Sequence, residues 1–75
     1  MNPSEPIKAA DLLVRNLRRW RQERGLTIDE LASLTGIAAA RLQAIEAASA
    51  HAHLDEMSLL ALGLGVRIAA LFDAE

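Results

Sequence analysis

The segment from residue 25 to residue 46 constrains the fold most, because it carries signals for two short helices separated by a tight turn. Thr27 and Glu30 have the spacing of a capping box, in which each side chain accepts a hydrogen bond from the backbone N–H of the other residue. Gly36 permits a sharp turn, and the alanine-rich run after it strongly favours helix. We therefore predict helices over residues 27–34 and 38–47.

Apolar residues at helical spacing predict three further helices around this pair. Ser4 can cap the first of them with Pro6 in its first turn, and Gly25 suits its end because glycine readily adopts the left-handed conformation. These helices are expected over residues 5–24, 54–63 and 67–72. The residues expected to face inward are Ala10, Leu13, Leu17, Trp20, Leu31, Ala32, Leu34, Leu42, Ile45, Met57, Leu60, Ala61, Leu64, Ile68, Leu71 and Phe72. The sequence thus predicts an all-α fold, a compact five-helix bundle.

The chain has 75 residues and no cysteine, so packing or a partner subunit must stabilise it in place of disulfide bonds. Residues 1–75 are expected to form a single domain. No apolar run approaches the roughly 18 residues of a membrane span, and the first residues lack the pattern of a signal peptide. We therefore expect a cytoplasmic protein without membrane contact.

Nothing in the sequence indicates an enzyme. His51 and His53 offer two metal ligands without a third nearby in sequence, and Ser49 beside them has no group to orient a base. The glycines match no phosphate-binding pattern. We expect no catalytic residue, no cofactor and no bound metal.

The charge of the chain is unusual for a nucleic-acid-binding protein, for which a basic surface is the expected footprint. The formal net charge is −2, made up of +3 on residues 1–25 and −5 on residues 26–75. Only the first predicted helix is therefore basic.

Five pieces of the chain carry a resemblance to a known family. They are Arg21-Gln22-Glu23-Arg24-Gly25-Leu26-Thr27, Glu30-Leu31-Ala32, Thr35-Gly36-Ile37, Ile45-Glu46, and Leu64-Gly65-Val66 followed by Leu71-Phe72. In this order the chain closely resembles the Cro/C1-type helix-turn-helix family of phage and bacterial repressors, also called the XRE family, over about residues 13–72. Residues 1–12 would be an N-terminal extension of the first helix. The resemblance implies a lambda-repressor-like domain in which Arg21 pairs with Glu46; the alternative is that both are independent surface charges.

The resemblance also implies that the helix over residues 38–47 enters the major groove of DNA, with the start of the preceding helix at the DNA backbone. By position, the base-reading residues would be Ala39, Ala40 and Ala44, flanked by Ala38. An alanine methyl group has no donor or acceptor and can at best touch a thymine methyl. Direct reading of bases is therefore expected to be nearly absent.

Two positions that contact phosphates in the family have also changed. Ile28 stands where the family usually has a glutamine, and Ala48-Ser49 replaces its usual glycine and basic residue. Weaker binding to every DNA sequence is expected, because phosphate contacts supply most non-specific affinity. The remaining contacts would come from Thr27, Arg41, Gln43 and arginines of the first helix, although Arg41 and Gln43 also fit a purely solvated helix surface.

The last two predicted helices carry apolar residues where the family usually has polar ones. These are Leu59, Leu62, Ala69 and Ala70. Exposed apolar surface usually marks an interface, so these residues, with Arg67, predict a homodimer or partner interface. The alternative is that the connector over residues 48–53 or the N-terminal extension buries Leu59 and Leu62.

Two functions follow from these features. The first is a small dimeric transcription regulator that binds double-stranded operator DNA with weak sequence specificity, drawn from DNA shape and half-site spacing. The second is a helix-turn-helix domain that has lost DNA reading and regulates through protein contacts, as an antiactivator or an antitoxin-like partner. The alanine-rich reading face and the acidic net charge favour the second, and the resemblance favours the first.

Overall fold

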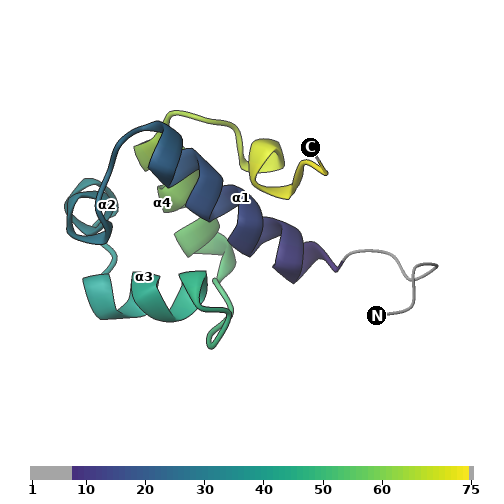
Figure 1. The fold of residues 1–75 in the computed structure, drawn as a ribbon, viewed down its shortest axis with the longest axis horizontal. Coiled ribbons are helices and arrows are strands. Elements are labelled where there is room, and N and C mark those ends of the chain that lie inside the picture. The colour runs from purple at the N-terminus through teal and green to yellow at the C-terminus, as the bar shows by residue number, and fades with distance from the viewer. Residues whose placement is uncertain (1–7, 75) are drawn as a thin grey trace.

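The computed structural model describes residues 8–74, which form helices and contain no strand. The elements are α1 (Ala9–Glu23), α2 (Ile28–Thr35), α3 (Ala39–Glu46), α4 (Leu54–Leu64) and the 3₁₀ helix η1 (Ile68–Phe72). α2 contacts α3 and α4, while η1 packs on α1 and α4 (Figure 1). The all-α fold is as predicted. The prediction of five α-helices was wrong in its last element, because the described residues form four α-helices and a 3₁₀ helix.

The helix boundaries follow local signals in the sequence. At the start of α2, Thr27 Oγ1 accepts from the N–H of Glu30 at 3.1 Å, and Glu30 Oε1 accepts from the N–H of Thr27 at 2.9 Å. Gly36 ends this helix in the left-handed region, with φ of +77°. α1 begins at Ala9, later than the predicted start at residue 5, because Lys8 before it is extended. The proposed cap Ser4 and Pro6 lie outside the described residues.

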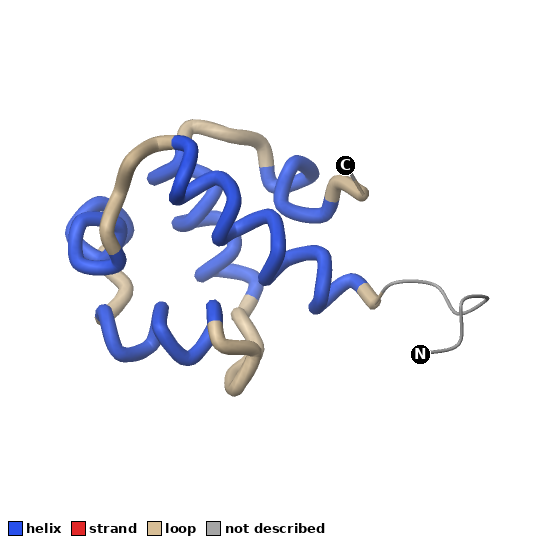
Figure 2. The backbone as a smooth tube through the Cα atoms, in the orientation of Figure 1, coloured by secondary structure: helices blue, strands red, loops and turns tan. Residues whose placement is uncertain are grey.

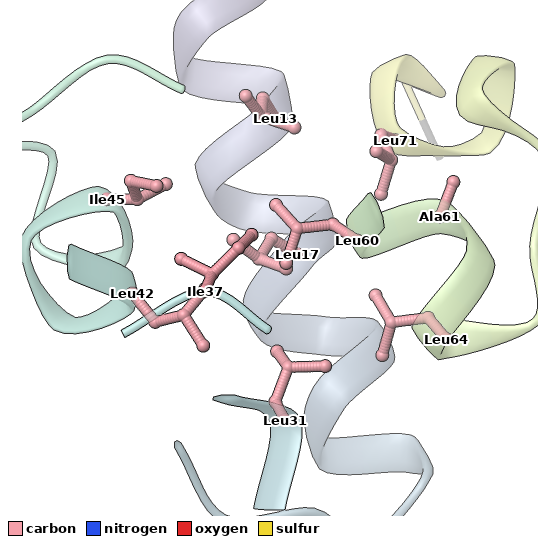
Figure 3. Close-up of a cluster of buried hydrophobic side chains, with 10 residues drawn as sticks. All are labelled: Leu13, Leu17, Leu31, Ile37, Leu42, Ile45, Leu60, Ala61, Leu64 and Leu71. Carbon is pink, nitrogen blue, oxygen red and sulfur yellow. The ribbon is translucent and has the colours of Figure 1, made fainter. Parts of the chain in front are cut away.

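The core gathers leucine and isoleucine side chains from all the helices (Figure 3). Leu17, Leu31, Leu42, Leu60 and Leu71 are completely buried. Burying side chains of this size is the main source of stability in so small a domain, at about 1.5–3 kcal/mol each.

Three residues expected to face inward do not. Ala10 is exposed, Ile68 is 39% exposed and Leu34 is 58% exposed. Thr35 takes the inward position at the end of α2, where its hydroxyl donates to the carbonyl of Leu31 at 2.8 Å. α4 approaches so closely that a Cβ on Gly63 would lie 2.8 Å from the methyl group of Thr35. A leucine would not fit the space that Thr35 occupies.

A two-point ion pair joins α1 to α3. Arg21 Nε lies 2.7 Å from Glu46 Oε2, and Arg21 Nη2 lies 3.0 Å from Glu46 Oε1. Arg21 Nη1 also donates to the carbonyl of Leu26 at 2.8 Å, and Arg18 donates to the backbone carbonyl of Glu46 at 2.6 Å. Both charged side chains are largely buried, and the hydrogen bonds that Arg21 donates to Glu46 raise the pKa of Arg21. The structure therefore brings the two expected partners together.

The C-terminal segment is fixed to α1 by a residue that the sequence patterns did not single out. Asn16 is 1% exposed, and its Nδ2 donates to the carbonyls of Leu71 at 3.0 Å and Asp73 at 2.7 Å. Arg15 adds a hydrogen bond to the carbonyl of Ala74 at 2.9 Å. Because these bonds satisfy backbone carbonyls, they hold η1 and the residues after it against the bundle.

Ala48 lies in the left-handed region, with φ of +60°, after the end of α3. A residue with a Cβ is strained there by about 1 kcal/mol or more. We predict that Ala48→Gly raises the free energy of unfolding by about 1 kcal/mol, measured by urea denaturation. Ala47→Gly is the matched control, because Ala47 has φ of −84° and glycine there should lower stability by about 0.5–1 kcal/mol. Equal effects of the two substitutions would contradict strain at Ala48.

Candidate nucleic-acid interface

The outward face of α3 is almost entirely alanine. Ala38, Ala40, Gln43 and Ala47 are exposed, and Ala39 and Ala44 are half-buried. Gln43 is therefore the only exposed side chain on α3 that can form hydrogen bonds. Its amide can pair with adenine, whereas the alanine methyl groups offer van der Waals contact alone.

The start of α2 offers backbone N–H groups but little positive charge. A helix N-terminus attracts a phosphate through its dipole and its unpaired N–H groups. Thr27 is exposed there, whereas Ile28 is half-buried and packs against the core. Asp29 and Glu30 lie in the first turn and are exposed, so they oppose an approaching phosphate. This end of α2 can position a DNA backbone only weakly.

Arg41 does not point freely to solvent, although it is the only cation on α3. Its Nε lies 2.9 Å from Glu56 Oε2 and its Nη2 lies 3.0 Å from Glu56 Oε1. Nη2 also donates to the carbonyl of His51 at 2.7 Å. The side chain thus ties α3 to the connector and to the start of α4, which the sequence patterns did not anticipate.

A comparison with known protein families matches residues 17–71 to the helix-turn-helix family. The chain belongs to the Cro/C1-type helix-turn-helix family. This is a family of DNA-binding regulators rather than of enzymes. No curated protein and no solved structure matches the chain.

Arginines of α1 line an open groove of about 290 Å³ that reaches the end of α3. Arg15, Arg18 and Arg19 line it together with Ala48 at the end of α3. Arg19 and Arg24 also stack on Trp20, with guanidinium carbons 5.3 and 4.9 Å from the ring centroid. Half-buried Trp20 is therefore covered by cations and packs on the core, so its ring is not an open platform for bases.

α4 exposes leucine side chains. Leu62 is 79% exposed and Leu59 is 40% exposed, so the connector does not bury them. Arg67 and Ala69 are exposed, while Ala70 is half-buried and its carbonyl accepts from Trp20 Nε1 at 3.5 Å. Apolar exposure is wider than the sequence indicated, because Leu34 and Leu54 are 58% and 72% exposed.

In the segment of residues 8–74, no three His, Cys, Asp or Glu side chains come together as metal ligands, and both His51 and His53 are exposed. None of its helices has the length and hydrophobicity needed to cross a bilayer.

The pair of Arg41 and Glu56 makes stability depend on pH. The hydrogen bonds from Arg41, and then from the backbone N–H of His53, lower the pKa of Glu56 from 4.5 to about 2. A carboxyl group whose pKa is lower in the folded than in the unfolded protein stabilises the fold at any pH above its unfolded-state pKa. This stabilisation disappears as the pH falls toward the pKa of the folded protein. We predict that the free energy of unfolding of the wild type, measured by urea denaturation, falls between about pH 4.5 and pH 2.

In the Glu56→Gln variant this fall should be smaller, and the variant should be less stable than the wild type at pH 6. Arg41→Ala is the matched comparison, because it removes the main cause of the lowered pKa and leaves the carboxyl group in place. A Glu56→Gln profile parallel to the wild type over this range would show that the carboxylate of Glu56 does not stabilise the fold.

Proposed function

We propose that this protein is a transcription regulator that binds duplex DNA through α2 and α3 with weak sequence preference. Family membership carries the proposal, because the match over residues 17–71 includes both helices of the motif. The capped start of α2 and the exposed face of α3 support it, since both elements are present and outward-facing. Thr27 and Gln43 would supply polar contacts, and the backbone N–H groups of α2 would contact a phosphate.

The surface chemistry limits how such a protein can recognise its site. With one hydrogen-bonding side chain exposed on α3, specificity must come mainly from DNA shape and from the spacing of two half-sites. A smooth alanine face has one advantage, because it allows α3 to approach the groove closely without a bulky side chain. Affinity should be modest, and the slope of log K against log salt concentration should be shallow, since few phosphates are neutralised.

A homodimer would provide the second half-site. The proposed interface comprises Leu59, Leu62, Arg67, Ala69 and Ala70. Asp55 lies at the start of α4 and Arg67 just beyond its end. A two-fold axis near Leu59 and Leu62 would bring Asp55 of one copy beside Arg67 of the other, so the surface is complementary to itself in charge as well as in hydrophobicity.

The experiment that tests DNA binding is a titration of a labelled duplex of about 20 base pairs from the protein's own promoter, followed by fluorescence anisotropy at low and at physiological salt. We expect binding at low salt that weakens as salt rises, with a shallow slope because few phosphates are neutralised. Gln43→Glu should lower the affinity about tenfold or more, because it places a carboxylate on the face that enters the groove. Gln22→Glu makes the same change on exposed α1 and should have a much smaller effect.

Equal losses from the two glutamate variants would show that α3 is not the docking element. Absence of any binding at low salt would refute the proposed function altogether.

The second candidate function is regulation through protein contacts without DNA. The specific observation in its favour is Leu62, which is 79% exposed on a helix outside the DNA-facing pair. A protein that is dimeric or captures a protein partner, yet binds no duplex at low salt, would refute the first function and favour this one.

The dimer is tested by Leu62→Glu. Since Leu62 is mostly exposed in a single chain, we expect the variant to fold normally but to have the mass of a monomer by light scattering, because a charge cannot be buried unpaired in an interface. Ser33→Glu adds the same charge to an exposed position on α2 and should leave the dimer intact. A Leu62→Glu protein that remains dimeric would refute this placement of the interface.

A further inference from the structure

We infer that Glu56 restrains DNA binding by holding Arg41, the single cation of α3, in an internal contact. The inference rests on the proposed function, because it concerns the affinity of the same α2 and α3 surface for DNA. It assigns a role to a residue on α4, outside the helix-turn-helix pair. The loop between α3 and α4 turns back to lead into α4 (Figure 2). At the start of α4, Glu56 Oε2 lies 2.9 Å from Arg41 Nε.

The hydrogen bonds of Arg41 leave no free pair of donors. An arginine reads a guanine with two neighbouring N–H groups, either from Nε and Nη2 or from Nη1 and Nη2. Glu56 occupies the first pair through contacts of 2.9 and 3.0 Å. The second N–H of Nη2 donates to the carbonyl of His51 at 2.7 Å, so only Nη1 is left for another acceptor. In this arrangement Arg41 cannot bind a guanine with two hydrogen bonds.

Glu56 also opposes DNA by its charge. The carboxylate compensates the guanidinium at close range, and this removes most of the attraction of Arg41 for a phosphate. Glu56 is held in place independently, because its Oε1 accepts from the backbone N–H of His53 at 2.8 Å. If Arg41 turned toward DNA, the carboxylate would stay behind as an uncompensated negative charge beside the DNA backbone. The pKa of Glu56, already below neutral pH in an ordinary glutamate, is lowered further, so the carboxylate is ionised at neutral pH.

The consequence is large because α3 has so little else to offer. Apart from Arg41, Gln43 is the only polar side chain at the outward surface of this helix. Whether α3 presents a cation to DNA therefore depends on Glu56. We expect duplex DNA to compete with this carboxylate for Arg41, so that loss of the carboxylate increases affinity.

The test is Glu56→Gln, which preserves the size of the side chain and an oxygen that can accept from His53 N–H. We expect affinity for a mixed-sequence duplex of about 20 base pairs to rise about tenfold at low salt. The slope of log K against log salt concentration should steepen by about 1, because one more phosphate or base contact becomes available to a free cation. Asp73→Asn removes the same charge from an exposed site near the C-terminus, and it should change affinity less than about twofold.

Arg41→Ala and the double variant complete the cycle. If Glu56 acts through Arg41, the gain in affinity from Glu56→Gln should be clearly smaller when Arg41 is absent, because only the charge of the carboxylate is then removed. NMR of the free protein provides a readout independent of DNA: the Arg41 Nε–H proton should exchange slowly with water in the wild type and rapidly in Glu56→Gln.

The outcomes separate this inference from the proposed function. If the wild type binds DNA and Glu56→Gln binds no better than Asp73→Asn, the inference alone is overturned. A gain of the same size in the Arg41→Ala background also overturns it, since Glu56 would then act by charge alone. If none of these proteins binds the duplex at low salt, the proposed function fails, and the restraint on DNA binding fails with it.

Discussion

The ion pair between Arg21 and Glu46 is the interaction on which the arrangement of this domain most depends. α3 is a short helix without a side-chain cap at its start, and eight residues form a helix of marginal stability by themselves. It is held in place by tertiary contacts: Leu42 and Ile45 enter the core, and Glu46 is gripped by Arg21 through two hydrogen bonds. The orientation of α3 against α1, and with it the outward face of the helix-turn-helix, rests on this pair.

The other end of α3 is held by the same kind of contact, and this has a cost for recognition. Both charged side chains of the helix are used internally, Glu46 toward α1 and Arg41 toward Glu56. What remains on the outward surface is alanine and one glutamine. A helix that is fixed by its own charged residues is well ordered, but it has little left with which to distinguish one base pair from another. Family membership therefore favours DNA binding, whereas the chemistry of the outward face of α3 favours only weak recognition of bases.

The domain divides its surface between two kinds of contact. α2 and α3 form the helix-turn-helix face, on which α3 presents alanine and one glutamine, whereas α4 and η1 expose Leu59, Leu62 and Ala69. Because these faces belong to different helices, a protein partner or a second copy could bind without covering α3. Glu56 lies at the junction between them, at the start of α4 and in contact with α3. A contact made at α4 would thus be close to the residue that controls the only cation of α3.

Local signals in the sequence were sufficient to predict the capping box of Thr27 and Glu30, the end of α2 at Gly36, and the helical structure of the alanine-rich segment α3. Each of these features depends on residues only a few positions apart. The pairing of Arg21 with Glu46 could be named in advance only through resemblance to a family. Tertiary structure alone decided that Thr35, not Leu34, faces inward, since the close approach of α4 at Gly63 limits the space there. It also decided that Arg41 meets Glu56, because an arginine can bond to any acceptor within its reach. Which acceptor lies there is set by how the helices pack.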